Sequence, residues 1–135
     1  MLERVGRGGK PVGDVISKRR IVLVVDDDRG VQEAVRAELA GRDYEVLIAS
    51  DGEAALRLLE SLTPDVLVLD LMLPNVSGPS VAAKLRSFPR RPRLLICSAV
   101  PQADEIAQDL QADAFVLKPF VRADLRQEIE RLLNV

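Results

Sequence analysis

The stretch Ile21-Val-Leu-Val-Val-Asp-Asp-Asp28 decides the fold, because an apolar run ends there abruptly in carboxylates. A run without polar alternation is typical of a parallel strand covered on both faces. Two later runs have the same form: residues 66–69 end at Asp70, and residues 114–117 end at Lys118. Charged groups at the ends of buried strands are costly unless an ion or a phosphate uses them. We therefore expect the functional site at these strand ends.

Segments with helical periodicity lie between the apolar runs. Asp28 is predicted to cap a helix that ends near Gly41, with an apolar stripe at i, i+4 and i+8. The segment Ser50-Asp-Gly-Glu53 has capping-box spacing and predicts that Ser50 caps a second helix, which ends before Thr63-Pro64. Pro79 suits the first position of a third helix. The stripes predicted to face inward are Val31, Val35 and Leu39; Ala55, Leu58, Leu59 and Leu62; Val81, Leu85 and Phe88; and Val121, Leu125, Ile129, Leu132 and Leu133.

Adding short strands over 45–49 and 94–98 and a helix over 102–110 gives five strands that alternate with five helices. This pattern predicts an α/β fold, a doubly wound five-stranded parallel sheet with right-handed crossovers. One common order for such sheets is 2-1-3-4-5, the flavodoxin-like order, in which ligands bind beyond the carboxyl ends of the strands. That order gathers at one edge Asp26, Asp27, Asp70, Ser98 and Lys118.

Composition limits the classes of function. A chain of 135 residues with 47% hydrophobic and 30% charged residues suits one soluble domain. The net charge of -2 argues against nucleic acid as the main partner, and no run approaches the roughly 18 apolar residues of a membrane span. We expect residues 1–19, which are rich in glycine and basic groups, to form a flexible leader, and residues 20–135 to form the domain.

Histidine is absent, and there is one cysteine. The absence of histidine removes the commonest general base and any nucleophile paired with an imidazole, so chemistry must use carboxylates, hydroxyls, lysine and hard cations. Cys97 lies in an apolar run and is predicted to be a buried core residue. A single cysteine cannot form an internal disulfide, which favours a reducing, cytoplasmic location.

The predicted edge suits phosphoryl chemistry. Three carboxylates at close range repel, so they share protons or hold a cation, and an oxygen-only ligand set suits Mg²⁺. With the charge reduced by the metal and Lys118, Asp70 can act as a nucleophile toward phosphorus. The product is a labile acyl phosphate, and without histidine the chain needs an external phosphoryl donor.

Four blocks carry a resemblance to a known family: Val24-Val-Asp-Asp-Asp28, Asp70-Leu-Met-Leu-Pro74 with Gly78, Ser98-Ala99, and Lys118-Pro-Phe120. Together they resemble the receiver domain of two-component response regulators over residues 20–135. The resemblance implies that a histidine kinase or phosphotransfer protein phosphorylates Asp70. It implies Mg²⁺ bound directly by Asp27, Asp70 and the Met72 carbonyl, with Asp26 acting largely through water.

The resemblance also implies roles around the site. Ser98 stands at the position of the switch hydroxyl, Phe115 at that of the aromatic residue that changes rotamer, and Lys118 at that of the phosphate-binding lysine, with a cis bond to Pro119. Three departures are Ser98 for threonine, Phe115 for tyrosine, and Gln111 where glycine usually ends the helix. Met72 and Val100 stand where many relatives carry polar side chains, so we expect phospho-Asp70 to hydrolyse slowly.

These inferences predict a phosphorylation switch rather than a metabolic enzyme. The altered surface is expected around the fourth helix, the fifth strand and the fifth helix, where a protein effector or a dimer partner binds. No output module follows the last helix, so the effect is expected through another protein or a missing part of a longer parent. Two alternatives stay open: a phosphorylation-independent interaction module with a vestigial site, and a Mg²⁺-dependent phosphohydrolase, which would generally need a second acid where Met72 stands.

Overall fold

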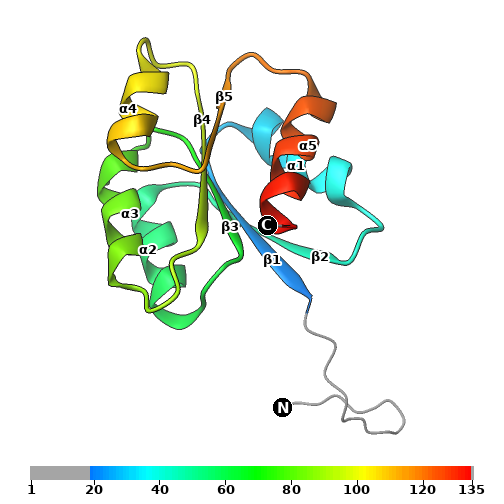
Figure 1. Ribbon diagram of the computed structural model, residues 1–135, viewed down its shortest axis with the longest axis horizontal. Helices are drawn as coiled ribbons and strands as arrows, with labels where there is room; N and C mark the ends of the chain where they lie inside the picture. Colours follow the sequence, from blue (N-terminus) through cyan, green and yellow to red (C-terminus); the bar gives the residue numbers. More distant parts are fainter. Residues whose placement is uncertain (1–18, 135) are drawn as a thin grey trace, which may run out of the picture.

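The computed structural model describes residues 19–134, which form a parallel sheet covered by helices on both faces (Figure 1). The sheet has five strands in the order β2-β1-β3-β4-β5, which confirms the predicted fold class. The elements are β1 (Arg20–Val25), α1 (Arg29–Leu39), β2 (Tyr44–Ala49), α2 (Gly52–Ser61), β3 (Val66–Leu69), α3 (Gly78–Lys84), β4 (Arg93–Ser98), α4 (Ala103–Asp109), β5 (Ala114–Leu117) and α5 (Arg122–Leu133). The predicted leader, apart from Arg19, lies outside the described residues.

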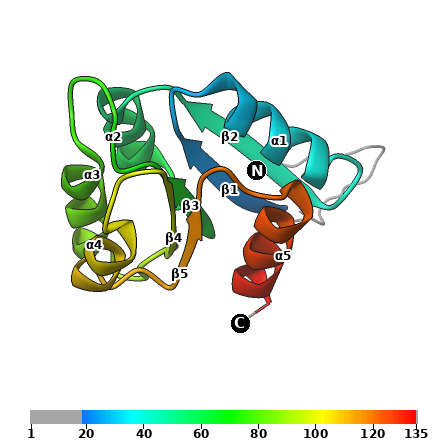
Figure 2. The same cartoon turned by 90° about the horizontal axis from the view of Figure 1, so that it is seen from above.

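The sheet separates two hydrophobic cores, and Figure 2 shows α1 and α5 on one side of it and α2, α3 and α4 on the other. One face of β1, represented by Val22 and Val24, packs under α1 and α5. The other face, with Leu23 and Val25, packs under α2, α3 and α4. Because β1 and β3 are buried on both faces, their apolar runs need no alternation. No helix within residues 19–134 combines the length and apolar character required to cross a membrane.

Helix starts follow the predicted capping chemistry with one correction. Asp28 caps α1 as predicted, and its Oδ1 accepts the Gly30 N–H at 2.7 Å. The predicted cap Ser50 is wrong, because Asp51 caps α2 and accepts the Ala54 N–H at 2.7 Å. Both residue types cap helices well, so the local sequence favours neither strongly.

The structure also differs from the prediction at several helix ends and in the membership of the apolar stripes. Val121 was predicted to face inward but is 64% exposed, because it is the N-cap of α5 and precedes its first turn. The third helix ends at Lys84 and continues as a single 3₁₀ turn to Ser87, so Phe88 lies beyond it and is half-buried. Leu62 likewise follows the end of α2 and is half-buried.

The outer helices α1 and α5 lie side by side and share charged contacts. Arg126 Nε lies 3.1 Å from Glu38 Oε1, and Arg42 Nη1, in the loop after α1, lies 3.3 Å from Glu130 Oε2. At the amino-terminal edge of the sheet, an Arg20 guanidinium nitrogen donates to the Leu133 carbonyl. These contacts tie the first strand and first helix to the last helix.

Gln111 follows α4 with a positive φ of 60°. The departure noted in the sequence therefore falls at a left-handed position, where a side chain strains the backbone and glycine does not. The carbonyl of Gln111 accepts a hydrogen bond from Arg91 Nη2 at 2.8 Å, which helps to hold this conformation.

We expect Gln111→Gly to raise the free energy of unfolding by about 1 kcal/mol, because it removes the left-handed strain and keeps the backbone contact to Arg91. Urea denaturation measures the change. As a control, Gln108→Gly inside the same helix should lower stability by about 1 kcal/mol. Equal destabilisation by both changes would contradict the strain at Gln111.

Candidate functional site

The hydrogen bonding of the parallel sheet continues one residue beyond the strands and builds the site. The Asp26 N–H donates to the Ala49 carbonyl at 3.1 Å, and the Asp70 N–H donates to the Val25 carbonyl at 3.0 Å. On the other side, the Lys118 N–H donates to the Ser98 carbonyl at 3.0 Å. The regular register therefore brings residues that are far apart in the sequence to one level at the carboxyl edge.

Three carboxylates meet at this edge, as predicted. Oxygens of Asp26, Asp27 and Asp70 lie within 4.8 Å of one another. Asp26 is 1% exposed and Asp70 is 7% exposed, whereas Asp27 is exposed. Two of the three charges are thus shielded from water, which strengthens their mutual repulsion.

Lys118 supplies the compensating positive charge. Its Nζ lies 2.9 Å from Asp26 Oδ2 and 3.1 Å from Asp70 Oδ2. Burial favours the neutral amine, but hydrogen bonding and attraction to Asp26 and Asp70 outweigh it and raise the pKa of Lys118. The side chain is therefore held as an ammonium ion between two carboxylates. The Lys118–Pro119 bond is cis, as the family resemblance implied.

The close packing of charges destabilises the ionised form of Asp26. Burial raises its pKa, while contacts from Lys118 and the Asp28 N–H oppose the rise and the charge of Asp70 adds to it. Apart from the Lys118 ammonium, no donor within residues 19–134 reaches Asp26 Oδ2. The ionised form of this residue is therefore under-compensated in the folded protein.

The loop between β3 and α3 presses closely on Asp70. The Met72 N–H donates to Asp70 Oδ1 at 3.3 Å, while the Met72 side chain is 70% exposed. A Cβ atom at Gly78 would lie 2.4 Å from the Asp70 carbonyl oxygen, closer than any side chain permits. Gly78 is thus required for the loop to reach the end of β3, which gives a physical reason for its place in the block that carries the family resemblance.

The remaining predicted residues lie around this cluster. Ser98 is fully buried, and its Oγ accepts the Val100 N–H at 3.3 Å. Phe115 is half-buried and packs against the core beneath α4. Cys97 is buried as predicted, and burial raises the pKa of its thiol to about 12, so it stays protonated.

The donor set fits a hard divalent cation. It consists of carboxylate oxygens from Asp26, Asp27 and Asp70, without nitrogen or sulfur ligands, which suits Mg²⁺. Lys118 occupies the position from which an ammonium ion can pair with these carboxylates or with an anion bound beside them. The site can therefore hold a cation and a phosphate oxygen next to a carboxylate nucleophile.

Gln32 and its partner Ser50 lie beside this cluster, a contact that the sequence did not predict. Gln32 is 9% exposed and donates through Nε2 to the Asp26 carbonyl at 2.7 Å and to Ser50 Oγ at 3.2 Å. Its position one turn after the helix cap Asp28 was the only signal in the sequence. Neither acceptor can be predicted from helical periodicity, because both lie at strand ends.

A parallel five-stranded fold with this acidic edge defines a class of signalling domain. The response regulator receiver domain family matches residues 22–130. The chain is 39% identical over 115 residues to the response regulator MprA of Mycolicibacterium vanbaalenii, covering 84% of this chain and 50% of that protein. It is 40% identical over 101 residues to the transcriptional regulatory protein KdpE of Mycobacterium tuberculosis, covering 74% and 45% respectively. The chain belongs to the response regulator receiver family.

Solved structures agree with this assignment. A response regulator from Chloroflexus aurantiacus is 29% identical with a TM-score of 0.78, covering 87% of this chain and 100% of that one. The response regulator TrrA from Thermotoga maritima, solved in complex with Mg²⁺ and BeF, is 29% identical with a TM-score of 0.73, covering 84% and 98%. The chain spans about half the length of the curated relatives it matches.

We expect Asp26→Asn to stabilise the fold at neutral pH by about 1 kcal/mol, because it removes a buried charge from a crowded site. Since burial raises the pKa of Asp26, the folded protein binds this proton more tightly than the unfolded chain does. The stability contributed by the neutral carboxyl group is therefore lost as pH rises through that raised pKa. Urea unfolding at acidic and neutral pH should show the gain of Asp26→Asn shrinking toward acid.

Asp28→Asn is the matched control, since asparagine caps a helix as well as aspartate does and the residue is exposed. We expect little change in its stability at either pH. A loss of stability in Asp26→Asn at neutral pH would contradict the burial cost.

Proposed function

We propose that this chain is a phosphorylation switch in which Asp70 accepts a phosphoryl group from a histidine kinase or a histidine phosphotransfer protein. The observation that carries the proposal is the setting of Asp70. This carboxylate is 7% exposed, belongs to a carboxylate cluster with the geometry to hold a cation, and lies 3.1 Å from the Lys118 ammonium. Such an arrangement serves a nucleophile whose charge must be balanced before and after it reacts.

The transfer uses one carboxylate oxygen of Asp70. That oxygen attacks the donor phosphorus, the P–N bond of the donor phosphohistidine breaks, and the electron pair returns to the imidazole, which takes a proton from solvent. Asp70 then carries an acyl phosphate, and Lys118 exchanges part of its pairing with Asp70 for a phosphoryl oxygen. A bound Mg²⁺ would be held by Asp26, Asp27, Asp70 and the Met72 carbonyl, and would supply neutralisation of phosphate charge.

The structural response proposed for the switch begins at Ser98. Its hydroxyl is buried beside the Val100 N–H and can move to donate to a phosphoryl oxygen. The space it leaves would admit Phe115, which is half-buried on the neighbouring strand β5. Phosphorylation then shifts a population between two packings rather than creating a new fold.

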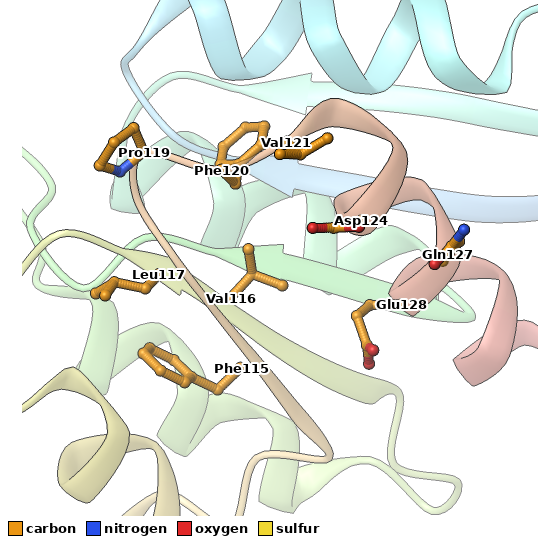
Figure 3. Close-up of a pocket in the computed structure, with 9 residues that line it drawn as sticks. All are labelled: Phe115, Val116, Leu117, Pro119, Phe120, Val121, Asp124, Gln127 and Glu128. Carbon is orange, nitrogen blue, oxygen red and sulfur yellow. The ribbon is translucent and has the colours of Figure 1, made fainter.

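The surface formed by α4, β5 and α5 is the proposed output. Between β5 and α5 lies a hollow of about 450 Å³, lined by residues that include Phe115, Leu117, Val121 and Glu128. Figure 3 shows Phe115 and Leu117 on one side of β5 and Val116 on the other. Leu117 and Val121 are 56% and 64% exposed, so a protein effector or a second copy would find apolar contacts that Phe115 can alter.

The proposed setting is the reducing cytoplasm, with a protein effector or an attached output domain as the reader of the switch. Such a domain can belong to the same polypeptide, since this chain spans about half the length of the curated relatives it matches. In this proposal the domain is a switch and does not turn over a metabolite. Met72 stands where a phosphohydrolase of the rival class would generally need its second acid, which disfavours that alternative.

We expect incubation with Mg²⁺ and acetyl phosphate or phosphoramidate to add one phosphoryl group, detected by intact mass. Asp70→Asn should abolish the adduct, because the amide is not a nucleophile toward phosphorus. Asp65→Asn is the matched control: Asp65 is an exposed carboxylate at the opposite end of β3, and the variant should be phosphorylated normally.

The outcomes separate the rival functions. The absence of an adduct with every donor would favour a phosphorylation-independent module. Multiple turnover of a phosphate ester would favour a phosphohydrolase. An adduct that survives Asp70→Asn would assign the phosphoryl group to another residue.

We expect phospho-Asp70 to persist for minutes or longer after the donor is removed, because Met72 and Val100 offer no side-chain polar group to position the attacking water. Met72→Asn should shorten the lifetime by about tenfold, the effect of one hydrogen bond of about 1.4 kcal/mol in the transition state. Met72→Leu should leave it unchanged. Decay of the unaltered protein within seconds, followed by intact mass, would contradict this expectation.

A further inference from the structure

Gln32 is a buried polar side chain that the proposed phosphotransfer does not use. Within residues 19–134, the buried polar or charged residues are Asp26, Asp70, Ser98 and Gln32. The first three belong to the phosphorylation site, and Gln32 lies on α1, beside the loop that carries Asp26 and Asp27. A buried amide of this kind is costly unless its hydrogen bonds are satisfied, so its contacts are informative.

Its amide nitrogen joins two loops of the site edge. Gln32 Nε2 donates to the backbone carbonyl of Asp26 at 2.7 Å and to Ser50 Oγ at 3.2 Å. The shorter bond goes to the peptide group that links Asp26 to Asp27. The longer bond goes to the loop that follows β2.

Hydrogen bonds also hold the peptide groups on either side of this one. The Asp26 N–H is held by the Ala49 carbonyl at 3.1 Å, and Asp26 Oδ1 accepts the Asp28 N–H at 2.9 Å. Between these two, Gln32 holds the carbonyl of the peptide that links Asp26 to Asp27. Because the peptide bond is planar, holding the carbonyl also fixes the plane that leads into Asp27.

The position of the Asp27 side chain depends on that peptide plane more than the positions of Asp26 and Asp70 depend on theirs. The Asp27 side chain is exposed and makes no hydrogen bond or ion pair with any other residue in the range 19–134. Asp26 and Asp70, by contrast, are both paired with Lys118. With no side-chain partner among residues 19–134, Asp27 is positioned by its backbone, which sets where its Cα–Cβ bond starts and points.

We propose that Gln32 is a positioning residue for the divalent cation: it fixes the peptide between Asp26 and Asp27 and so presents the Asp27 carboxylate beside that of Asp70. The inference rests on the proposed function for the cation, and it adds a residue outside the ligand set. A ligand held in place before the cation arrives loses less conformational freedom on binding, which increases affinity.

A purely structural role makes a different prediction. If Gln32 only satisfies a buried carbonyl, its removal lowers the free energy of unfolding and leaves the Mg²⁺ affinity of the folded protein unchanged. If Gln32 positions Asp27, removal weakens Mg²⁺ binding in protein that is still folded. High Mg²⁺ concentration should then restore phosphorylation, because mass action compensates for the lost preorganisation.

The test compares Gln32→Met, which keeps the size and removes both donors, with Ser50→Ala, which removes only the second acceptor. Mg²⁺ binding is measured by titration of backbone amide resonances and by calorimetry, without any phosphoryl donor. We expect Gln32→Met to raise the dissociation constant for Mg²⁺ by about tenfold, and Ser50→Ala to leave it unchanged. In phosphorylation assays, the Mg²⁺ concentration at half-maximal rate should rise while the maximal rate is retained.

Equal Mg²⁺ affinity in folded Gln32→Met and unaltered protein would overturn the positioning role alone. Absence of Mg²⁺ binding by the unaltered protein would overturn the proposed function and this inference with it. If Gln32→Met does not fold, Gln32→Asn retains an amide that is too short to reach the Asp26 carbonyl. The same loss of Mg²⁺ affinity is then expected, and unchanged affinity would overturn the inference.

Discussion

Repulsion among three carboxylates at the carboxyl edge of the sheet is the constraint on which the rest of the structure depends. Parallel pairing of β1 with β3 forces Asp26 and Asp70 to the same level, and Asp27 follows directly. The Lys118 ammonium, delivered by β5, compensates part of this charge. Repulsion among the carboxylates therefore lowers the stability of the fold at the place where a cation and a phosphate can bind.

Apolar burial in the two hydrophobic cores compensates for that loss of stability. Central strands buried on both faces hold the charged ends on rigid supports, and the loops add the contacts that complete the edge. Gly78 permits the close approach of its loop to Asp70, and Gln32 anchors the opposite loop through a backbone carbonyl. The site is built mainly from backbone hydrogen bonds at strand ends, with few side-chain pairs.

The sequence predicted the strands and the gathering of charges because both follow from apolar runs and from the topology rules of parallel sheets. It did not predict which of two adjacent residues caps α2, since Ser50 and Asp51 can both serve. Val121 fits the helical period but precedes the first turn of α5, so the period placed it on the wrong side. Gln32 lay beyond prediction for a different reason: its burial depends on acceptors at the ends of two strands, which only tertiary structure brings to α1.

The contact between Arg20 and the Leu133 carbonyl determines where an output domain joined to this domain would begin. It places the start of β1 and the end of α5 together at the amino-terminal edge of the sheet, opposite Asp70. Six residues of β1 separate this edge from the carboxylates, a span of about 20 Å. A polypeptide joined at either of these points would begin at the end of the sheet remote from Asp70. In the proposed switch, its first residues would respond to the displacement of helices rather than touch the modified side chain.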